Sequence, residues 1–239
     1  MSIGRQFRMV WTGDEDPQTA SAALLPARLA WACTQVLPVA GAGISAFSSD
    51  FRVPLGASDD TASHAERLQF TLGEGPCLHA HAGPDAVRST GAQIEQRWPL
   101  MYDELNLHTP YRSIVSLPLH LSDDTSGALD LYLTQSTSAD VLDLDPAAIV
   151  ADTIVEALDF SDTATFSAHR PGPPWLYGPE SAHRMQMWVA IGLLTARLGL
   201  AGNDALAVLR GYAYSHDRLV DDIADDLIDG LLPAADLRP

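Results

Sequence analysis

The sequence predicts an α+β domain, with an antiparallel sheet flanked by helices, followed by a smaller all-α domain of three helices. Apolar runs of strand length occur in two turn-linked pairs, with helix-periodic segments before, between and after them. Beyond a stretch rich in Pro, Gly, Ser and Thr, only helical periodicity occurs. This order is typical of an antiparallel α+β plan with a separate helical unit. The expected parts are a flexible N-terminus at 1–18, the α+β domain at 19–160, a linker at 161–180 and the helical domain at 181–233.

The composition limits the classes of function. The chain has 239 residues, enough for two domains, and a formal net charge of −17 with a pI near 4.5. This charge argues against a general polyanion binder or a membrane-surface protein, because both rely on accumulated positive charge. All 14 basic residues are arginine, so any contact with a polyanion has to be local and made by guanidinium groups.

The two cysteines and the apolar content indicate a cytoplasmic protein. Cys33 and Cys77 lack CxxC spacing and are expected to be reduced thiols. The segment 1–17 has no sustained apolar stretch and is not a signal peptide. No stretch approaches the roughly 18 apolar residues of a membrane span, so no membrane is expected as a partner.

The elements of the α+β domain follow from periodicity and turn residues. Leu25, Leu29 and Val36 recur at helical spacing and predict a helix within 18–37, which Pro38 ends. In the last helix of the domain, Ile149 and Ile154 are expected to point inward. The other predicted elements are strands at 42–47 and 51–55 around a turn at 48–50, a helix at 59–72, a short strand at Ile94, a helix at 99–107, strands at 113–121 and 127–133 around a turn at 122–126, and a helix at 145–160.

Four short segments of this domain resemble the GAF domains that bacteria fuse to output modules. They are LGEGPC at 72–77, RWP at 97–99, RSIVSLPL at 112–119 and GALDLY at 127–132. The resemblance covers roughly 19–160 and implies a sensor that holds a small-molecule ligand between its sheet and helices. The expected pocket residues are Phe47, Leu72, Cys77, Trp98 and Tyr102. The alternative is that these side chains simply fill the core.

The helical domain has three amphipathic segments. Met187, Ile191, Leu194 and Leu198 form one stripe, and a second helix is expected to begin at Asn203 or Asp204. The third is expected to begin at Asp217 and to align Val220, Ile223, Ala224, Leu227 and Leu231 inward, with Asp221, Asp222, Asp225 and Asp229 on its outer side.

This domain resembles an ANTAR module, the three-helix RNA-binding unit of bacterial antiterminators. The matching residues are AIGLL at 190–194, DAL at 204–206, Leu209-Arg210, Tyr212-Ala213, Leu219, Ile223-Ala224 and Leu227-Ile228. The resemblance implies RNA contacts by Arg184, Arg197, Arg210 and Tyr212, with guanidinium groups on phosphates or bases and the ring stacked on an unpaired base. The chain departs from the family at 189–192, where VAIG replaces QAKG or a close variant.

No catalytic residue, metal or cofactor is expected. Gly41–Ala46 satisfies GxGxxA, but a helix precedes it and a strand follows, the reverse of a dinucleotide site. Cys77, His79 and His81, with Glu74 nearby, form a metal set only if the segment is a strand, and Pro76 favours a short helix. No nucleophile motif or separated carboxylate pair is present, so the chain is not expected to be an enzyme.

These observations predict a signal-responsive transcriptional regulator. A GAF sensor would control an ANTAR module that binds RNA hairpins in target transcripts, and the protein would act as a homodimer. The alternative is that the ANTAR module no longer binds RNA and serves as a dimerisation or protein-interaction element, as the apolar Val189 and Ile191 and the acidic third helix indicate. A third hypothesis is a redox or metal sensor that acts through Cys77.

Overall fold

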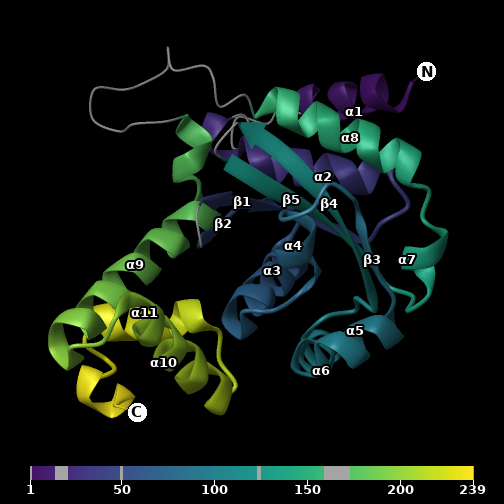
Figure 1. The fold of residues 1–239 in the computed structure, drawn as a ribbon. Helices are drawn as coiled ribbons and strands as arrows, with labels where there is room; N and C mark the ends of the chain where they lie inside the picture. The colour runs from purple at the N-terminus through teal and green to yellow at the C-terminus, as the bar shows by residue number, and fades with distance from the viewer. Residues whose placement is uncertain (1, 14–20, 49–50, 123–124, 159–172, 239) are drawn as a thin grey trace.

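In a computed structural model the protein is described over residues 2–13, 21–48, 51–122, 125–158 and 173–238. A five-stranded sheet carries helices on both faces, and the C-terminal helices extend from the side of β2 (Figure 1). The strands are β1 (Gly41–Ser48), β2 (Phe51–Ala57), β3 (Val87–Ser89), β4 (Ser113–Ser122) and β5 (Thr125–Leu133). The helices are α1 (Ile3–Thr12), α2 (Leu25–Val36), α3 (Asp60–Leu72), α4 (Pro76–Ala80), α5 (Gly91–Arg97), α6 (Pro99–His108), α7 (Ser138–Val141), α8 (Leu144–Ala157), α9 (Pro179–Leu198), α10 (Gly202–Ser215) and α11 (Val220–Ile228), with 3-10 turns at Ala22–Leu24, Pro174–Tyr177 and Ala234–Leu237.

The sheet is antiparallel throughout, in the order β2-β1-β5-β4-β3. The α+β class with an antiparallel sheet is therefore confirmed, and the predicted strand pairs are β1–β2 and β4–β5. Of the predicted turns, 49–50 and 123–124 lie outside the described residues. The order places β1 and β5 at the centre of the sheet, side by side, although more than 75 residues separate them in the sequence.

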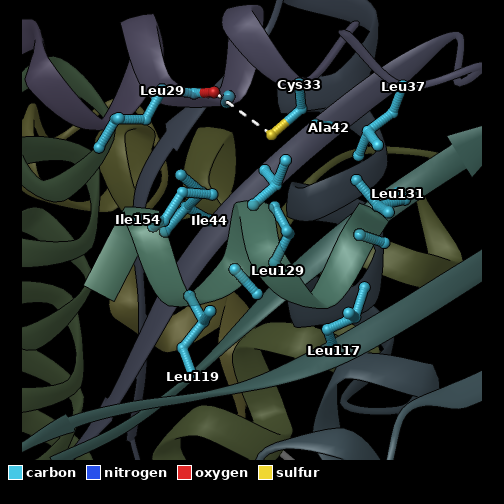
Figure 2. Close-up of a cluster of buried hydrophobic side chains, with 14 of the residues drawn as sticks. Leu29, Cys33, Leu37, Ala42, Ile44, Leu117, Leu119, Leu129, Leu131 and Ile154 are labelled. Atoms are coloured by element: carbon cyan, nitrogen blue, oxygen red, sulfur yellow. Dashed lines mark hydrogen bonds between the residues drawn. The ribbon is translucent and has the colours of Figure 1, made fainter. Parts of the chain in front are cut away.

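One face of the sheet carries the main hydrophobic core (Figure 2). Side chains alternate along a strand, so Leu129 and Leu131 of β5 point to the same side as Ile44 of β1. There they meet Leu29 of α2 and Ile154 of α8, and all five side chains are fully buried. Burial of a side chain of this size stabilises the fold by about 1.5–3 kcal/mol, so this layer holds the two central strands in place.

Helices α3, α4, α5 and α6 lie on the opposite face (Figure 1). The Asp59 carboxylate caps α3 by accepting a hydrogen bond from the Ala62 amide at 2.9 Å, and Gly73 ends the helix in the left-handed conformation. Between these helices and the sheet lies a second cluster, made of Ala62, Ala65, Ile94, Trp98, Met101, Leu105, Tyr111, Ile114 and Tyr132.

Three expectations for this part of the chain are wrong. The N-terminus is expected to be flexible over 1–18, but within the described residues 2–13 helix α1 forms and fully buries Phe7 against α2 and α8. Ile94 lies in helix α5 rather than in a strand, because Thr90 and Gln93 form a capping box that begins a helix there. Ile149, expected to point inward, is 46% exposed.

The C-terminal helices pack around Met187, Ile191, Leu194, Ala205, Leu209, Ala213, Val220, Ile223, Ala224 and Leu227. Helix α10 begins after Ala201 rather than at Asn203 or Asp204. Helix α11 begins at Val220 rather than at Asp217, and Leu231, expected to be inward, is 74% exposed.

The predicted linker at 161–180 is described only from 173 onward, where a 3-10 turn over Pro174–Tyr177 buries Trp175 against the main core. Among the described residues, no single helix has both the length and the apolar content needed to cross a membrane, and α9 and α10 meet that test only as a pair bent by 106°.

Candidate functional site

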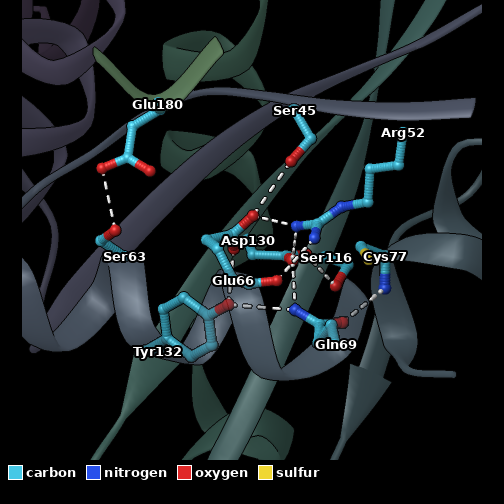
Figure 3. Close-up of polar contacts among 10 residues, drawn as sticks. All are labelled: Ser45, Arg52, Ser63, Glu66, Gln69, Cys77, Ser116, Asp130, Tyr132 and Glu180. Atoms are coloured by element: carbon cyan, nitrogen blue, oxygen red, sulfur yellow. Dashed lines mark hydrogen bonds and ion pairs between the residues drawn. The ribbon is translucent and has the colours of Figure 1, made fainter. Parts of the chain in front are cut away.

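A buried polar network lies between the sheet and α3 (Figure 3). The strand register brings side chains from four strands to this face, and α3 lies across them. The members of this α3 network, none more than 3% exposed, are Ser45 of β1, Arg52 of β2, Ser116 of β4, Asp130 and Tyr132 of β5, and Glu66 and Gln69 of α3. Polar side chains at this depth are tolerated only when they bond to one another.

The Glu66 carboxylate is the centre of the network. Ser45 Oγ donates to Oε2 at 3.0 Å, Tyr132 OH donates to Oε1 at 2.5 Å, and the Arg52 guanidinium forms an ion pair with Oε2. Arg52 Nη1 also donates to the Glu66 carbonyl oxygen at 2.7 Å, which ties β2 to α3. A Cβ at Gly43 would come within 2.2 Å of Glu66 Oε1, so the carboxylate approaches β1 only because a glycine stands there.

The glycines of the run Gly41-Ala42-Gly43 therefore allow neighbouring side chains to pack closely against β1. Gly41 has the same use as Gly43, because a Cβ at Gly41 would come within 2.2 Å of the Tyr111 hydroxyl. The segment is strand β1 and opens no helix, so it lacks the strand–turn–helix context of a dinucleotide fingerprint.

Asp130 extends the network toward α4. Ser116 Oγ donates to one carboxylate oxygen of Asp130, and Gln69 Nε2 donates to the other at 2.8 Å. Gln69 Nε2 also donates to the Tyr132 hydroxyl at 3.0 Å, and Gln69 Oε1 accepts from the Cys77 amide at 3.4 Å. The network thus connects the centre of the sheet, α3 and the start of α4.

The charges of the network balance at neutral pH. Burial and the neighbouring Glu66 carboxylate raise the pKa of Asp130 to about 8, although Arg52 and the hydrogen bonds from Ser116 and Gln69 act in the opposite direction. Glu66 and Arg52 then form the ion pair, and Asp130 is mainly the neutral carboxylic acid.

The raised pKa of Asp130 predicts a pH-dependent stability. Below pH 8 the folded state holds a proton that an unfolded aspartate releases near pH 4, so the contribution of Asp130 is fully present below pH 4 and is lost as the pH rises through 8. We expect the free energy of unfolding of Asp130→Asn to rise relative to that of wild type by about 1 kcal/mol or more between pH 5 and pH 9. A tenfold change in proton affinity corresponds to about 1.4 kcal/mol.

Urea unfolding at pH 5, 7 and 9 measures this difference, with the exposed Asp152→Asn as the control that removes a carboxylate from α8. If the free energy of unfolding changed with pH to the same extent in wild type and in Asp130→Asn, the protonation of Asp130 would be contradicted.

The structure divides the five predicted pocket residues between two places. Phe47 and Cys77 pack with Ala128 near α4. Trp98 belongs to the second cluster, and Leu72 of α3 and Tyr102 of α6 pack against it. The α3 network lies on the same face of the sheet, and only the Cys77 amide joins it.

Cys77 and His79 lie in helix α4 (Pro76–Ala80), as Pro76 indicated, and His81 follows as its C-cap residue. The His81 ring stacks on Phe47 with centroids 3.7 Å apart, and His79 Nδ1 lies 3.3 Å from the Gly75 carbonyl oxygen. Burial raises the pKa of Cys77 well above that of a free thiol, so its reactive thiolate is suppressed. In the described part of the chain these side chains form no metal-ligand group.

A second face of α3 contacts the C-terminal helices. Arg67 Nε lies 3.2 Å from Asp221 Oδ2, and Arg67 Nη2 lies 2.5 Å from Asp222 Oδ1. The Val220 amide donates to Thr71 Oγ1 at 3.1 Å, which anchors the start of α11. Two further bonds hold the start of α9. Ser63 Oγ of α3 donates to Glu180 Oε1, and Ser181 Oγ donates to the carbonyl oxygen of Pro54 in β2.

Phe70 of α3 belongs to the hydrophobic cluster of the C-terminal helices. Two guanidinium groups lie over its ring, that of Arg184 at 3.2 Å from the centroid and that of Arg210 at 4.8 Å. Such cation–π contacts contribute about 2 kcal/mol when desolvated. The arginine pair therefore attaches the helical module to α3.

The buried charge of Arg184 is only partly balanced by its neighbours. Its Nη1 lies 3.1 Å from Asp221 Oδ1, but the angle makes no hydrogen bond, and its Nε has no hydrogen-bond partner among the described residues. Burial lowers the pKa of Arg184 to about 9, and Asp221 offsets this only in part. Asp221 also serves Arg67, so one carboxylate is shared by two guanidinium groups.

The four predicted RNA-contacting residues occupy different environments. Arg184 is buried and Arg210 is half-buried, both on Phe70, whereas Arg197 is exposed on α9. Tyr212 is half-buried and stacks on the His216 ring at 4.0 Å. The placement of Asp221 on the outer side of α11 is wrong, since it is 2% exposed and faces α3.

The sequence does contain a signal for the missed network. In β5, Leu129, Leu131 and Leu133 face the main core, so the intervening Asp130 and Tyr132 must face the other side. A carboxylate in a strand that is otherwise apolar indicates a buried partner. Glu66 has a signal of the same kind, because it lies four residues after Ala62 and three before Gln69, on the buried face of α3.

Comparison with known proteins gives similarities in shape. No family model and no curated protein matches the chain. Escherichia coli SdiA is 12% identical over 92% of this chain and 93% of its own, with a TM-score of 0.46. Free methionine-R-sulfoxide reductase from Neisseria meningitidis is 18% identical over 66% and 90%, with a TM-score of 0.42. The phycoerythrobilin-bound GAF domain of a cyanobacterial phytochrome is 12% identical over 66% and 92%, with a TM-score of 0.41.

Proposed function

We propose that the protein is a signal-responsive regulator in which a GAF-type sensor controls an ANTAR-type helical module that binds RNA stem-loops. The observation that carries this proposal is the packing of Arg184 and Arg210 on Phe70. It joins two of the arginines with expected RNA contacts directly to the sensor. In this conformation the module is docked and these guanidinium groups are withheld from RNA.

Helix α3 is the element that can transmit a signal. Glu66 and Gln69 face the buried network, and the adjacent Arg67 and Phe70 face the module. A small molecule that binds beside the network and shifts α3 would move both sets of contacts together, because a helix moves as a rigid unit.

The docked state is also suited to release. Among the described residues, Arg184 pairs with one carboxylate, which it shares with Arg67, and its Nε has no hydrogen-bond partner. A phosphate group would therefore satisfy Arg184 better than the interface does. RNA would then compete with Phe70 and Asp221 for the same guanidinium group. The bound and docked states exclude each other, which is the property a controlled output requires.

We expect weak RNA binding by the wild type and stronger binding after the docking contact is removed. Phe70→Ala should bind a synthetic two-hairpin RNA about tenfold or more tightly, because affinity rises with the fraction of molecules in the competent state. Fluorescence anisotropy at low and physiological salt measures this against a scrambled RNA, and binding should weaken with salt as phosphate contacts require. Circular dichroism melting establishes that Phe70→Ala remains folded.

Two arginine variants serve as matched tests. Arg197→Ala removes the exposed arginine of α9 and should weaken binding, whereas Arg5→Ala removes an equal charge from α1, on the far side of the molecule, and should not. Absence of RNA binding by wild type and by Phe70→Ala at low salt would overturn the RNA function.

That outcome would favour the second candidate function, a module that pairs with a second copy of the chain. Met185 and Val189 lie one helical turn apart on α9 and are 59% and 49% exposed. An apolar contact of this kind would give dimers that persist at high salt, which light scattering measures. No RNA complex would form.

A further inference from the structure

A cavity lies where the sensor meets the turn between α10 and α11. Its volume is about 50 Å³, several times the 10–15 Å³ that one water requires. His64 of α3, Glu104 and His108 of α6, and Asp217 of the turn line it. Neither the buried network nor the arginine contacts with Phe70 use these four side chains.

Three of the four converge on one point. His108 Nε2 lies 3.2 Å from Glu104 Oε2 and 3.6 Å from Asp217 Oδ1, and the ligand atoms of all three residues lie within 4.8 Å of one another. In a tetrahedral site with ligands about 2.0–2.1 Å from the metal, neighbouring ligand atoms lie about 3.3–3.4 Å apart. The two distances from His108 match this spacing to within about 0.3 Å.

The elements present these side chains to a common point. Glu104 and His108 lie one turn apart on α6, so both project from the same face of the helix. Asp217 has a positive φ of 52° in the turn before α11, a conformation that aspartate tolerates better than most residues. Arg218, which also lines the cavity, directs its guanidinium to Asp226 at 2.5 Å and so does not neutralise the cluster.

His64 supplies an independent observation. Its Nε2 is buried and has no hydrogen-bond partner among the described residues. The residue lines the same cavity, and its ring centroid lies 5.4 Å from that of His108. A buried imidazole nitrogen is normally bonded. Rotation of the His64 ring toward the cavity would let this nitrogen bond to a bound cation or to a water on that cation.

We propose that Glu104, His108 and Asp217 bind a divalent transition-metal ion of the Zn²⁺ type, with His64 beside its open position. One imidazole and two carboxylates suit Zn²⁺, and the nitrogen ligand disfavours Mg²⁺ and Ca²⁺, which take oxygen ligands. The ion would connect α6 of the sensor to the α10–α11 turn of the module. If the proposed RNA function holds, the ion stabilises the docked state and lowers RNA affinity.

The test is zinc binding by the full chain after treatment with EDTA. Calorimetric titration with ZnCl₂ should show one ion per chain, bound more tightly than Mg²⁺. His108→Ala and Asp217→Asn should each weaken binding at least about tenfold, since loss even of a residue that only supports a ligand typically costs 10–100-fold. His120→Ala removes an exposed histidine of β4 and should leave zinc affinity unchanged.

Hydrogen exchange provides a second readout. Zinc should slow exchange at residues 214–219 in wild type and not in Asp217→Asn, and circular dichroism confirms that the variants are folded. Zinc affinity that is equal in wild type, His108→Ala and Asp217→Asn would overturn the site, as would the absence of a stoichiometric ion. RNA affinity is measured separately, with and without zinc, so loss of the RNA function leaves this result intact.

Discussion

Replacement of Arg52 by methionine is expected to lower the free energy of unfolding by about 3–5 kcal/mol, the cost of breaking a buried ion pair by removing one partner. Arg52 is the only cation in the α3 network, and both carboxylates lie within 4 Å of its guanidinium. Without it, Glu66 keeps only the hydrogen bonds from Ser45 and Tyr132, and its charge has no counterion. Urea unfolding monitored by tryptophan fluorescence measures the loss.

Two variants isolate the cause. Arg52→Met combined with Glu66→Gln removes the ion pair as a whole and should regain most of the lost stability, because no buried charge remains. Arg112→Met removes a guanidinium whose bonds to described residues all go to carbonyl oxygens, those of Thr109, Tyr111 and Asn106, and should cost less. A loss below about 1 kcal/mol for Arg52→Met would show that the network does not depend on this ion pair.

Removal of the Asp221 charge is expected to undock the helical module. In Asp221→Asn the buried Arg184 loses the one carboxylate that pairs with it in the described part of the chain, and Arg67 loses one of two, so the docked state should be weakened by about 3 kcal/mol or more. Undocking transfers Arg184 to water, where its charge is solvated. Hydrogen exchange should therefore accelerate in the first turns of α9 and in α11, while α2 and α8 keep their protection.

The neighbouring Asp222 provides the matched control. Asp222→Asn removes the same charge at the next position, but the Asp222 side chain is 43% exposed and, within the described ranges, pairs across the interface with Arg67 alone. Such an exposed pair contributes about 0–1 kcal/mol, so exchange in α9 should change little. Equal exchange rates in Asp221→Asn and Asp222→Asn would contradict the role given to the buried carboxylate.

The part of the fold that the sequence predicted depends on neighbours along the chain. The β1–β2 and β4–β5 hairpins have short polar turns between apolar runs, and helix α3 has Asp59 as its N-cap and Gly73 at its end. These signals act over a few residues and can be read directly. The capping box of Thr90 and Gln93 is a signal of the same kind, and it outweighs the apolar character of Ile94 that suggested a strand.

Contacts between distant segments could not be predicted in this way. Helix α1 forms where a flexible end was expected because α2 and α8 provide a place to bury Phe7. Asp221 was expected on the outer face of the third helix. Helical periodicity shows which residues share a face, but not which faces are covered by other elements. Arg67, 154 residues earlier, makes that position an interface.

The sequence by itself therefore determined the α+β class, the hairpins and the acidic balance, since these depend on local pattern and composition. Only the tertiary structure decided which polar side chains meet. It brought Glu66 to Arg52 and Asp130, placed Arg184 on Phe70, and gathered Glu104, His108 and Asp217 around one cavity. The physical reason is that polar pairing depends on strand register and helix packing across long separations, which neither periodicity nor spacing encodes.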